Sequence, residues 1–279
     1  MITDLPLQLT SMDMILYADD GKAVGKAANR EDCLLNQADL NAIHKWSVVN
    51  RLPLSLQKCQ CLHIGHGNAR YAYTLGGLPI TAVEQCTDLG IIRTSDFSYN
   101  THINSIISKA SRSAGMLYRA FSTRNEVFIV KLYVAYVRPI LEYASVVWNP
   151  TRIGLQKDLE RVQRRFTRRL RGLRDMPYDK RLEHLQLISL KDRRLHADLA
   201  MAFKALRNVL GVSANTIGLQ LQSNAPTRSN GINLVVHKAV NETVAKVFKY
   251  RIAKQWNDLP SRVKLALSLN TFKKHLLKK

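Results

Sequence analysis

Near its N-terminus the chain has an apolar run, two acids and a glycine in an order that predicts a β-hairpin. An apolar run at 14–17 leads to two adjacent carboxylates, Asp19 and Asp20, and Gly21 follows them. This order is typical of two strands joined by a tight turn, with both carboxylates at its tip. Adjacent carboxylates repel each other unless a cation neutralises them, so the tip is a candidate site for a divalent metal ion. A surface turn without a ligand is the alternative.

Apolar residues at helical spacing follow Asn29, and short strands come next. Asn29 is a predicted N-cap, because acids follow it in the first turn. The apolar residues that then recur at helical spacing are Leu35, Ala38, Ala42, Trp46 and Val49. Pro53 ends the predicted helix. Strands are predicted at 59–64, at 71–75 and around 89–92.

From residue 101 onward the apolar spacing is almost entirely helical. The predicted helices are 102–121, 126–148 with a kink at Pro139, 155–173, 178–187, 192–210, 242–257 and 271–277. A polar stretch, 211–233, is a predicted linker. The longest apolar stretch, 127–148, contains Lys131, Arg138 and Glu142, which favours a buried helix over a membrane span. We therefore expect no membrane partner.

The charge of the chain is unevenly distributed between these two parts. The formal net charge of the 279 residues is +21. Residues 1–100 carry 8 Lys/Arg against 10 Asp/Glu, whereas residues 101–279 carry 34 against 11. A strongly basic helical part suits a polyphosphate partner, most simply RNA or DNA. A protein that is basic without such a partner is the alternative.

The cysteines and the N-terminus bear on the cellular compartment. The four cysteines are Cys33, Cys59, Cys61 and Cys86. Nothing at the N-terminus resembles a signal peptide, because no basic segment precedes an apolar one. We therefore expect reduced thiols and an intracellular protein of the nucleus, the cytoplasm or both, which is not secreted.

Short motifs occur in a fixed order along nearly the whole chain. In the first hundred residues they are I-T-D-L-P at 2–6, Y-A-D-D at 17–20, L-S-L-Q-K-C at 54–59 and D-L-G-I at 88–91. In the helical part they are R-P-I-L-E-Y at 138–143, W-N-P at 148–150, L-E-R-V-Q-R-R-F-T at 159–167 and W-N-D-L-P at 256–260. Together they resemble the C-terminal part of the polymerase protein of non-LTR (LINE-type, jockey-like) retrotransposons, including motifs C, D and E of its reverse transcriptase.

The resemblance implies an α+β fold in three parts. Residues 1–98 would form a partial reverse-transcriptase palm, an antiparallel sheet plus a helix, with motifs C, D and E. Residues 99–210 would form a helical thumb or post-thumb region that is basic. Residues 211–279 would form a linker and a C-terminal helical region.

The resemblance also implies the chemistry of an RNA-directed DNA polymerase. Such an enzyme, a nucleotidyltransferase, extends a DNA primer on an RNA template with dNTPs and two Mg²⁺ (or Mn²⁺) ions. Asp19 and Asp20 would be the catalytic metal ligands of motif C. Lys58 of motif D would be the general acid that protonates the leaving pyrophosphate. Leu89 and Gly90 of motif E, the primer grip, would let a strand approach the primer backbone closely.

Two departures from the family pattern limit this expectation. Asp88 stands where the family often has Tyr, and a carboxylate there would repel phosphate. The third catalytic carboxylate, which belongs to motif A, and the nucleotide-contacting motif B are not found in the sequence. We therefore expect a fragment of a retrotransposon polymerase that is inactive alone. A non-catalytic RNA- or DNA-binding protein derived from such an element is the alternative.

One predicted helix concentrates the positive charge. Residues 157–174 contain eight Lys/Arg, and an apolar stripe along the same segment consists of Val162, Phe166, Leu170 and Leu173. Burial of that stripe would turn the arginines outward, where their planar forks match phosphate. The candidate nucleic-acid-binding residues are Arg161, Arg164, Arg165, Arg168, Arg169 and Arg171. A solvated basic face and a nuclear localisation signal are the alternatives.

A zinc site is a separate hypothesis. Cys59, Cys61, His63 and His66 are four zinc-capable side chains within eight residues. In a strand the first three would share one face. Alternating ligands in one strand rarely close a tetrahedron, so a half-buried strand is the favoured interpretation.

Overall fold

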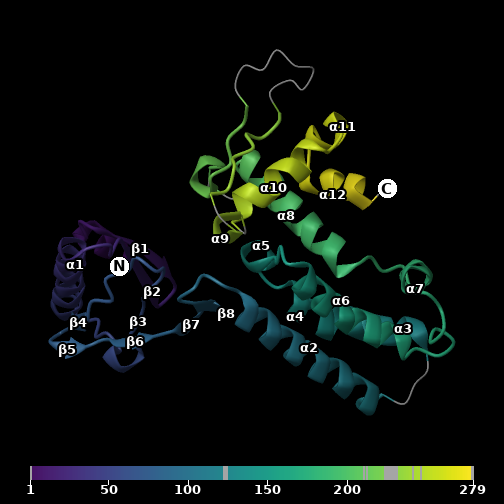
Figure 1. The fold of residues 1–279 in the computed structure, drawn as a ribbon, viewed down its shortest axis with the longest axis horizontal. Helices are drawn as coiled ribbons and strands as arrows, with labels where there is room; N and C mark the ends of the chain where they lie inside the picture. Colours follow the sequence, from purple (N-terminus) through teal and green to yellow (C-terminus); the bar gives the residue numbers. More distant parts are fainter. Residues whose placement is uncertain are drawn as a thin grey trace. The chain divides into compact units, whose positions relative to one another are not determined.

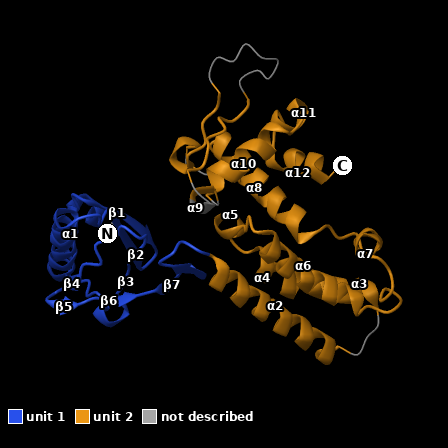
Figure 2. Ribbon diagram, viewed as in Figure 1, with its two compact units in different colours: residues 1–98 blue, residues 99–279 orange. Residues whose placement is uncertain are grey.

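The computed structural model describes residues 2–121, 125–209, 211, 213–222, 232–240, 242–245 and 247–277. Its class is α+β. The chain divides into two compact units, Met1–Ser98 (unit 1) and Tyr99–Lys279 (unit 2), shown in Figure 2. The boundary expected at residue 210 does not separate units, because the helices that follow it share a core with the helix before it.

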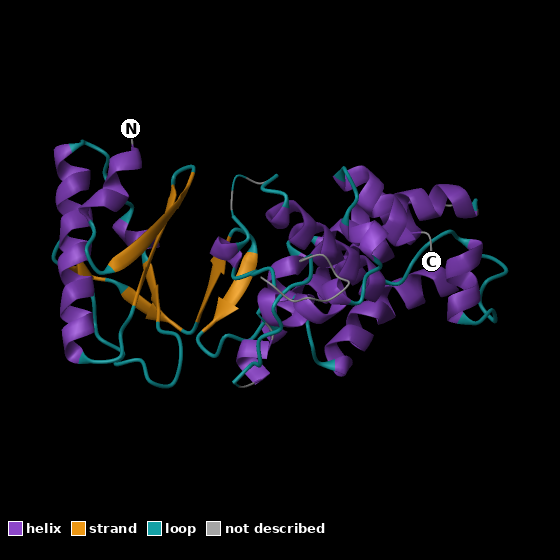
Figure 3. Cartoon of the chain, turned by 90° about the horizontal axis from the view of Figure 1, so that it is seen from above, coloured by secondary structure: helices purple, strands orange, loops and turns teal. Residues whose placement is uncertain are grey.

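The strands of unit 1 form four separate pairs (Figure 3). The pairs are β1 (Met12–Tyr17) with β2 (Asp20–Gly25), β3 (Gln60–Leu62) with β6 (Thr81–Val83), β4 (Thr74–Leu75) with β5 (Leu78–Pro79), and β7 (Gln85–Asp88) with β8 (Ile91–Thr94). The β3–β6 pair is parallel and the others are antiparallel. Within the described residues the strands do not join into the single antiparallel sheet that we expected.

Helix α1 (Arg30–Val49) confirms the predicted helix and its cap, since the Asn29 side chain accepts a hydrogen bond from the Asp32 amide. The predicted inner face is wrong in part. Leu35 and Val49 are 48% and 71% exposed, whereas the buried residues of the helix are Cys33, Asn36, Asp39, Ile43, Trp46 and Ser47. Ile43 and Trp46 pack with Leu5 of the 3-10 helix η1 (Ile2–Gln8) in the core of unit 1.

Unit 2 is almost entirely helical (Figure 1). Its helices are α2 (Asn100–Ala120), α3 (Glu126–Leu132), α4 (Arg138–Glu142), α5 (Ser145–Trp148), α6 (Ile153–Arg168), α7 (Tyr178–His184), α8 (Leu190–Leu206), α9 (Glu242–Ala245), α10 (Phe248–Asn257), α11 (Ser261–Lys264) and α12 (Leu269–Leu277). The short α11 was not predicted. The predicted linker contains a 3-10 helix, η4 (Asn215–Ile217), and its residues 223–231 lie outside the described chain. None of the described helices is long and apolar enough to cross a membrane.

The predicted helix 126–148 is interrupted on both sides of Pro139. Before the proline, a π-helical turn, η3 (Tyr133–Val137), ends with the Arg138 amide bonded to the Tyr133 carbonyl five residues back. After it, Ala144 adopts a left-handed conformation with φ of 49° and separates α4 from α5. Pro139 has no N–H to donate, so the bend extends over the neighbouring turns instead of forming one kink.

The C-terminal motif residues belong to a core that α8 shares with α10, α11 and α12. Phe203 of α8 stacks on Phe272 of α12 with ring centroids 4.6 Å apart, and Trp256 of α10 joins the same core. Asn257 donates to the Leu234 carbonyl and accepts from its amide, at 2.9 and 2.8 Å. The W-N-x-L-P segment that carries the resemblance is therefore a structural motif here.

Candidate carboxylate hairpin and basic face

The β1–β2 hairpin presents Asp19 and Asp20 as the sequence predicts. Tyr17 pairs with Asp20, so Ala18 and Asp19 form a two-residue turn, and Ala18 has a φ of 52°. Both carboxylates are exposed. A non-glycine residue with positive φ is strained, and such strain is often found at functional sites.

The two faces of the hairpin differ. Met14 and Ala23 share one face, which packs on the core of unit 1. The other face carries the apolar side chains of Ile15, Tyr17 and Val24, which are 55%, 65% and 51% exposed. In the described chain no third strand pairs with either edge of this hairpin.

One buried carboxylate, Asp39 of α1, anchors the base of the hairpin. Its oxygens accept hydrogen bonds from the amides of Thr10, Ser11 and Met12 at 2.8–2.9 Å, and from the hydroxyls of Thr10 and Ser11. Burial alone would raise the pKa of Asp39, but these hydrogen bonds outweigh it and lower the pKa to about 2. Sequence reasoning missed this residue, although helical spacing places it on the same face as Ile43 and Trp46.

We expect Asp39→Asn to destabilise unit 1 by about 2 kcal/mol, because an amide cannot accept all three backbone bonds. The lowered pKa of Asp39 gives a similar contribution to the free energy of unfolding, because a shift from 3.8 to about 2 corresponds to about 2 kcal/mol. That contribution is complete above pH about 4 and is lost as the pH falls through about 2. Urea unfolding across this pH range measures the contribution to stability. Hydrogen exchange of the amides of residues 10–12 shows whether their bonds to Asp39 are lost with it. The exposed Asp13→Asn is the control, and equal stability of the two variants would contradict the anchor.

The hairpin tip alone does not complete a metal site. Carboxylate oxygens are the donors that Mg²⁺ prefers, and Asp19 and Asp20 would supply them. Among the described residues, however, no group of three His, Cys, Asp or Glu side chains could hold a metal ion. Lys58 ends the 3-10 helix η2 (Leu56–Lys58), where it is exposed and forms no ion pair with a described carboxylate. No hydrogen bond or ion pair among the described residues joins Lys58 to Asp19 or Asp20.

Asp88 has a different role from the one expected. Its Oδ2 lies 2.7 Å from Nζ of Lys22 on β2 and 2.8 Å from Nε of Arg93 on β8. Burial favours a raised pKa for Asp88, but the hydrogen bond and charge of Lys22, together with Arg93, lower it. Two cations thus neutralise the carboxylate that we expected to repel phosphate, and it links β2 to the β7–β8 hairpin.

The primer-grip pair forms a turn instead of a strand. Leu89 and Gly90 connect β7 to β8, with φ of 47° and 80°. Leu89 is 46% exposed at this tip. The predicted strand around 89–92 thus begins only at Ile91, because Leu89 and Gly90 are the two central residues of a hairpin turn with positive φ at both positions.

The zinc hypothesis finds no support in the geometry. The Cys61 Sγ lies 3.7 Å from the His63 Nε2, but no third zinc-capable side chain joins them in the described chain. Burial raises the pKa of the Cys59 and Cys61 thiols, which disfavours the thiolate that zinc requires. His63 instead stacks on Tyr73, whose ring also contacts that of Tyr71.

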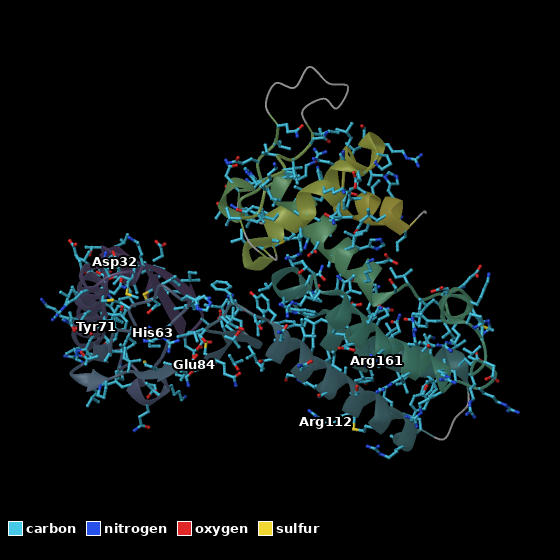
Figure 4. The ribbon with its side chains drawn as sticks, in the orientation of Figure 1. Asp32, His63, Tyr71, Glu84, Arg112 and Arg161 are labelled. Atoms are coloured by element: carbon cyan, nitrogen blue, oxygen red, sulfur yellow. The ribbon has the colours of Figure 1, made fainter. Side chains whose placement is uncertain are left out.

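The basic face of α6 has the orientation that the sequence predicts. The apolar stripe is buried: Val162, Phe166, Leu170 and Leu173 are 2–5% exposed. The outward side chains define what we call the basic face: Lys157, Arg161, Arg164, Arg165, Arg168, Arg169, Arg171 and Arg174, all exposed. Arg161, labelled in Figure 4, pairs with Asp158 at 2.9 Å. In the described chain, Arg165, Arg168, Arg171 and Arg174 form no ion pair, so they remain available to phosphate.

Buried Arg181 of α7 supports the end of this face. Helix α6 ends at Arg168, earlier than predicted, and a turn with Gly172 at φ of 77° follows. Arg181 is 4% exposed and donates to the carbonyls of Leu173 and Met176 at 3.4 and 3.1 Å. It thereby fixes the turn that carries Arg171 and Arg174. A basic residue inside a basic stretch gives no sequence signal for burial.

Comparison with known proteins adds one relative. An uncharacterized protein of Caenorhabditis elegans, B0403.1, is 30% identical over 111 residues, which are 39% of this chain and 56% of the relative. The chain thus spans about half the length of the curated relative that it matches. No family model and no solved structure matches the chain.

Proposed function

We propose that this chain derives from the RNA-directed DNA polymerase of a non-LTR, jockey-like retrotransposon. Unit 1 would be part of the palm, and unit 2 the thumb and the region after it. By itself the chain would bind RNA–DNA backbone inside the cell without extending a primer. The order of motifs supports the lineage, and the exposed carboxylate turn agrees with motif C.

The basic face of α6 is the observation that carries the binding function. Its apolar stripe is buried in unit 2, so the arginines cannot turn inward. Apart from Arg161, none of these arginines has an ion-pair partner in the described residues. Guanidinium groups in such a row neutralise backbone phosphates and release counterions, which gives sequence-independent binding. This face equally supports the alternative, a non-catalytic RNA- or DNA-binding protein derived from such an element.

The polymerase reaction needs a third metal ligand, which the described residues do not supply. Mg²⁺ or Mn²⁺ supplies charge stabilisation for nucleotidyl transfer when it is bound, and Asp19 and Asp20 would hold it. With two carboxylates and no third ligand in the described chain, we assign no step of that reaction to this chain alone. A partner chain that supplies the missing ligand and a dNTP site would complete it.

Primer extension beside a binding measurement tests this proposal. The purified chain and Asp19→Ala are incubated with an RNA template, a DNA primer, dNTPs and Mg²⁺ or Mn²⁺. We expect no extension from either protein, but equal, salt-sensitive binding of the template–primer by both. Extension that disappears in Asp19→Ala would overturn the expected inactivity, and absence of binding at low salt would overturn the nucleic-acid function.

A further inference from the structure

Two arginines of the basic face are held on aromatic rings, unlike their neighbours. The guanidinium carbon of Arg164 lies 4.6 Å from the ring centroid of Tyr178 on α7. The guanidinium carbon of Arg169 lies 4.3 Å from the ring centroid of Tyr118 on α2. Neither guanidinium has a hydrogen-bond acceptor among the described residues, so the N–H groups at its edge remain available.

Both rings are fixed through their hydroxyls. Tyr178 donates to Glu160 Oε1 at 2.5 Å and accepts from Gln163 Nε2 at 3.0 Å, so α6 holds it from two sides. Tyr118 donates to the Phe166 carbonyl at 2.7 Å, and its ring lies 4.9 Å from that of Phe166. Burial raises the pKa of both phenols, that of Tyr118 to about 12, so each hydroxyl stays protonated and keeps its bond.

The two stacked arginines lie at opposite edges of the basic face. At about 100° per residue, Arg164 and Arg169 are about 140° apart around the helix axis. Arg169 is the C-cap of α6 and keeps helical dihedral angles, φ −83° and ψ −10°, so this spacing applies to it. On the same count Arg161, Arg165 and Arg168 lie between the two. The edges of the face are therefore ordered, while its middle consists of side chains without a described aromatic partner.

We propose that Arg164 and Arg169 are a pre-oriented pair of phosphate ligands, positioned by Tyr178 and Tyr118, that grips the sugar–phosphate backbone of an RNA–DNA duplex. This inference rests on the proposed nucleic-acid function. A stacked guanidinium has already lost much of its rotamer freedom, so binding phosphate costs it less. The planar group offers one face to the ring and its N–H edge to phosphate, which a lysine ammonium cannot do.

Paired lysine substitutions test this positioning. Arg164→Lys with Arg169→Lys keeps the charge but loses the planar stack, whereas Arg165→Lys with Arg168→Lys changes side chains that have no stack to lose. Binding of a fluorescein-labelled RNA–DNA hybrid is measured by anisotropy at several KCl concentrations. We expect the substitutions at 164 and 169 to weaken binding about tenfold, because two cation–π contacts of ordinary strength are lost. The substitutions at 165 and 168 should weaken binding clearly less. Both pairs should keep the wild-type slope of log K against log salt, since the charge is unchanged.

Tyrosine variants separate positioning from loss of fold. Tyr118→Phe removes the hydroxyl bond but keeps the ring and its contact with Phe166, so it should weaken binding only slightly, whereas Tyr118→Leu removes the ring and should weaken binding about threefold without changing the salt slope. Circular dichroism melting shows whether each variant is folded. Equal losses in the two lysine pairs, or equal binding by Phe and Leu at 118, would overturn the inference while wild-type binding stands. Failure of the wild type to bind would overturn the proposed function itself.

Discussion

Replacing Arg165, Arg168, Arg171 and Arg174 with glutamine is expected to weaken binding of an RNA–DNA hybrid by at least about a hundredfold at low salt. These four exposed arginines have no ion-pair partner in the described chain, so phosphate is the anion that they are free to meet. Removing one arginine–phosphate interaction should lower the slope of log K against log salt by about 0.9, or about 3.6 for all four. Fluorescence anisotropy over a salt series measures both quantities.

The matched control removes the same number of charges elsewhere in unit 2. Lys254, Arg262, Lys273 and Lys274 are exposed cations of α10, α11 and α12, and their glutamine variant has the same net charge. We expect it to retain most of the affinity, because distant exposed charges are screened by salt. Equal losses of affinity in the two variants would mean that net charge, and not the basic face, causes binding.

Asp198→Ala is expected to destabilise unit 2 by about 3–5 kcal/mol, because it removes one member of a buried ion pair. Asp198 accepts two hydrogen bonds from Arg251 at 3.0 Å, and the two side chains are 3% and 9% exposed. Asn149 also donates to Asp198, and it accepts from the buried Arg194 at 3.1 Å. Without Asp198, the Arg251 guanidinium loses its carboxylate partner, and Asn149, which accepts from Arg194, loses its own acceptor. Urea unfolding followed by helical circular dichroism measures the loss.

Two further variants show whether the loss of stability in Asp198→Ala comes from a buried charge left without its partner. Asp175→Ala removes an exposed acid that has no ion-pair partner in the described chain, and should be within about 0.5 kcal/mol of the wild type. Arg251→Met combined with Asp198→Leu removes both members and should recover part of the stability, though not all, because Arg194 stays buried. No recovery in the double variant would assign the loss to packing.

The sequence predicts most of the helices and the carboxylate turn, because these depend on local signals. The Asn29 cap, the buried stripe of α6 and the Tyr17–Asp20 turn are examples. Apolar spacing is less informative where polar side chains are buried. Asp39 lies inside because three backbone amides of a distant segment need an acceptor, and no count of apolar residues contains that information.

Neither local sequence patterns nor the resemblance predicts which charged residues pair across the fold. Asp88 was compared with a family position, but its partners Lys22 and Arg93 depend on how two hairpins meet in space. The ion pair of Arg251 with Asp198 likewise connects residues 53 positions apart in the sequence. Such pairings become visible only in three dimensions. The metal and polymerase roles of Asp19, Asp20 and Lys58 stay predictions.

The outer face of the β1–β2 hairpin has a consequence for handling the chain in solution. On this face Ile15, Tyr17 and Val24 expose apolar side chains among the charged Asp13, Asp20 and Lys22, beside strand edges that no described strand covers. Such an edge is a template on which a second molecule can add a strand, and the apolar side chains favour that stacking. Lys22 lies on the same face, but it is engaged with Asp88 and so is less effective as a gatekeeper against aggregation. Self-association of the isolated chain should therefore depend more on its concentration than on temperature.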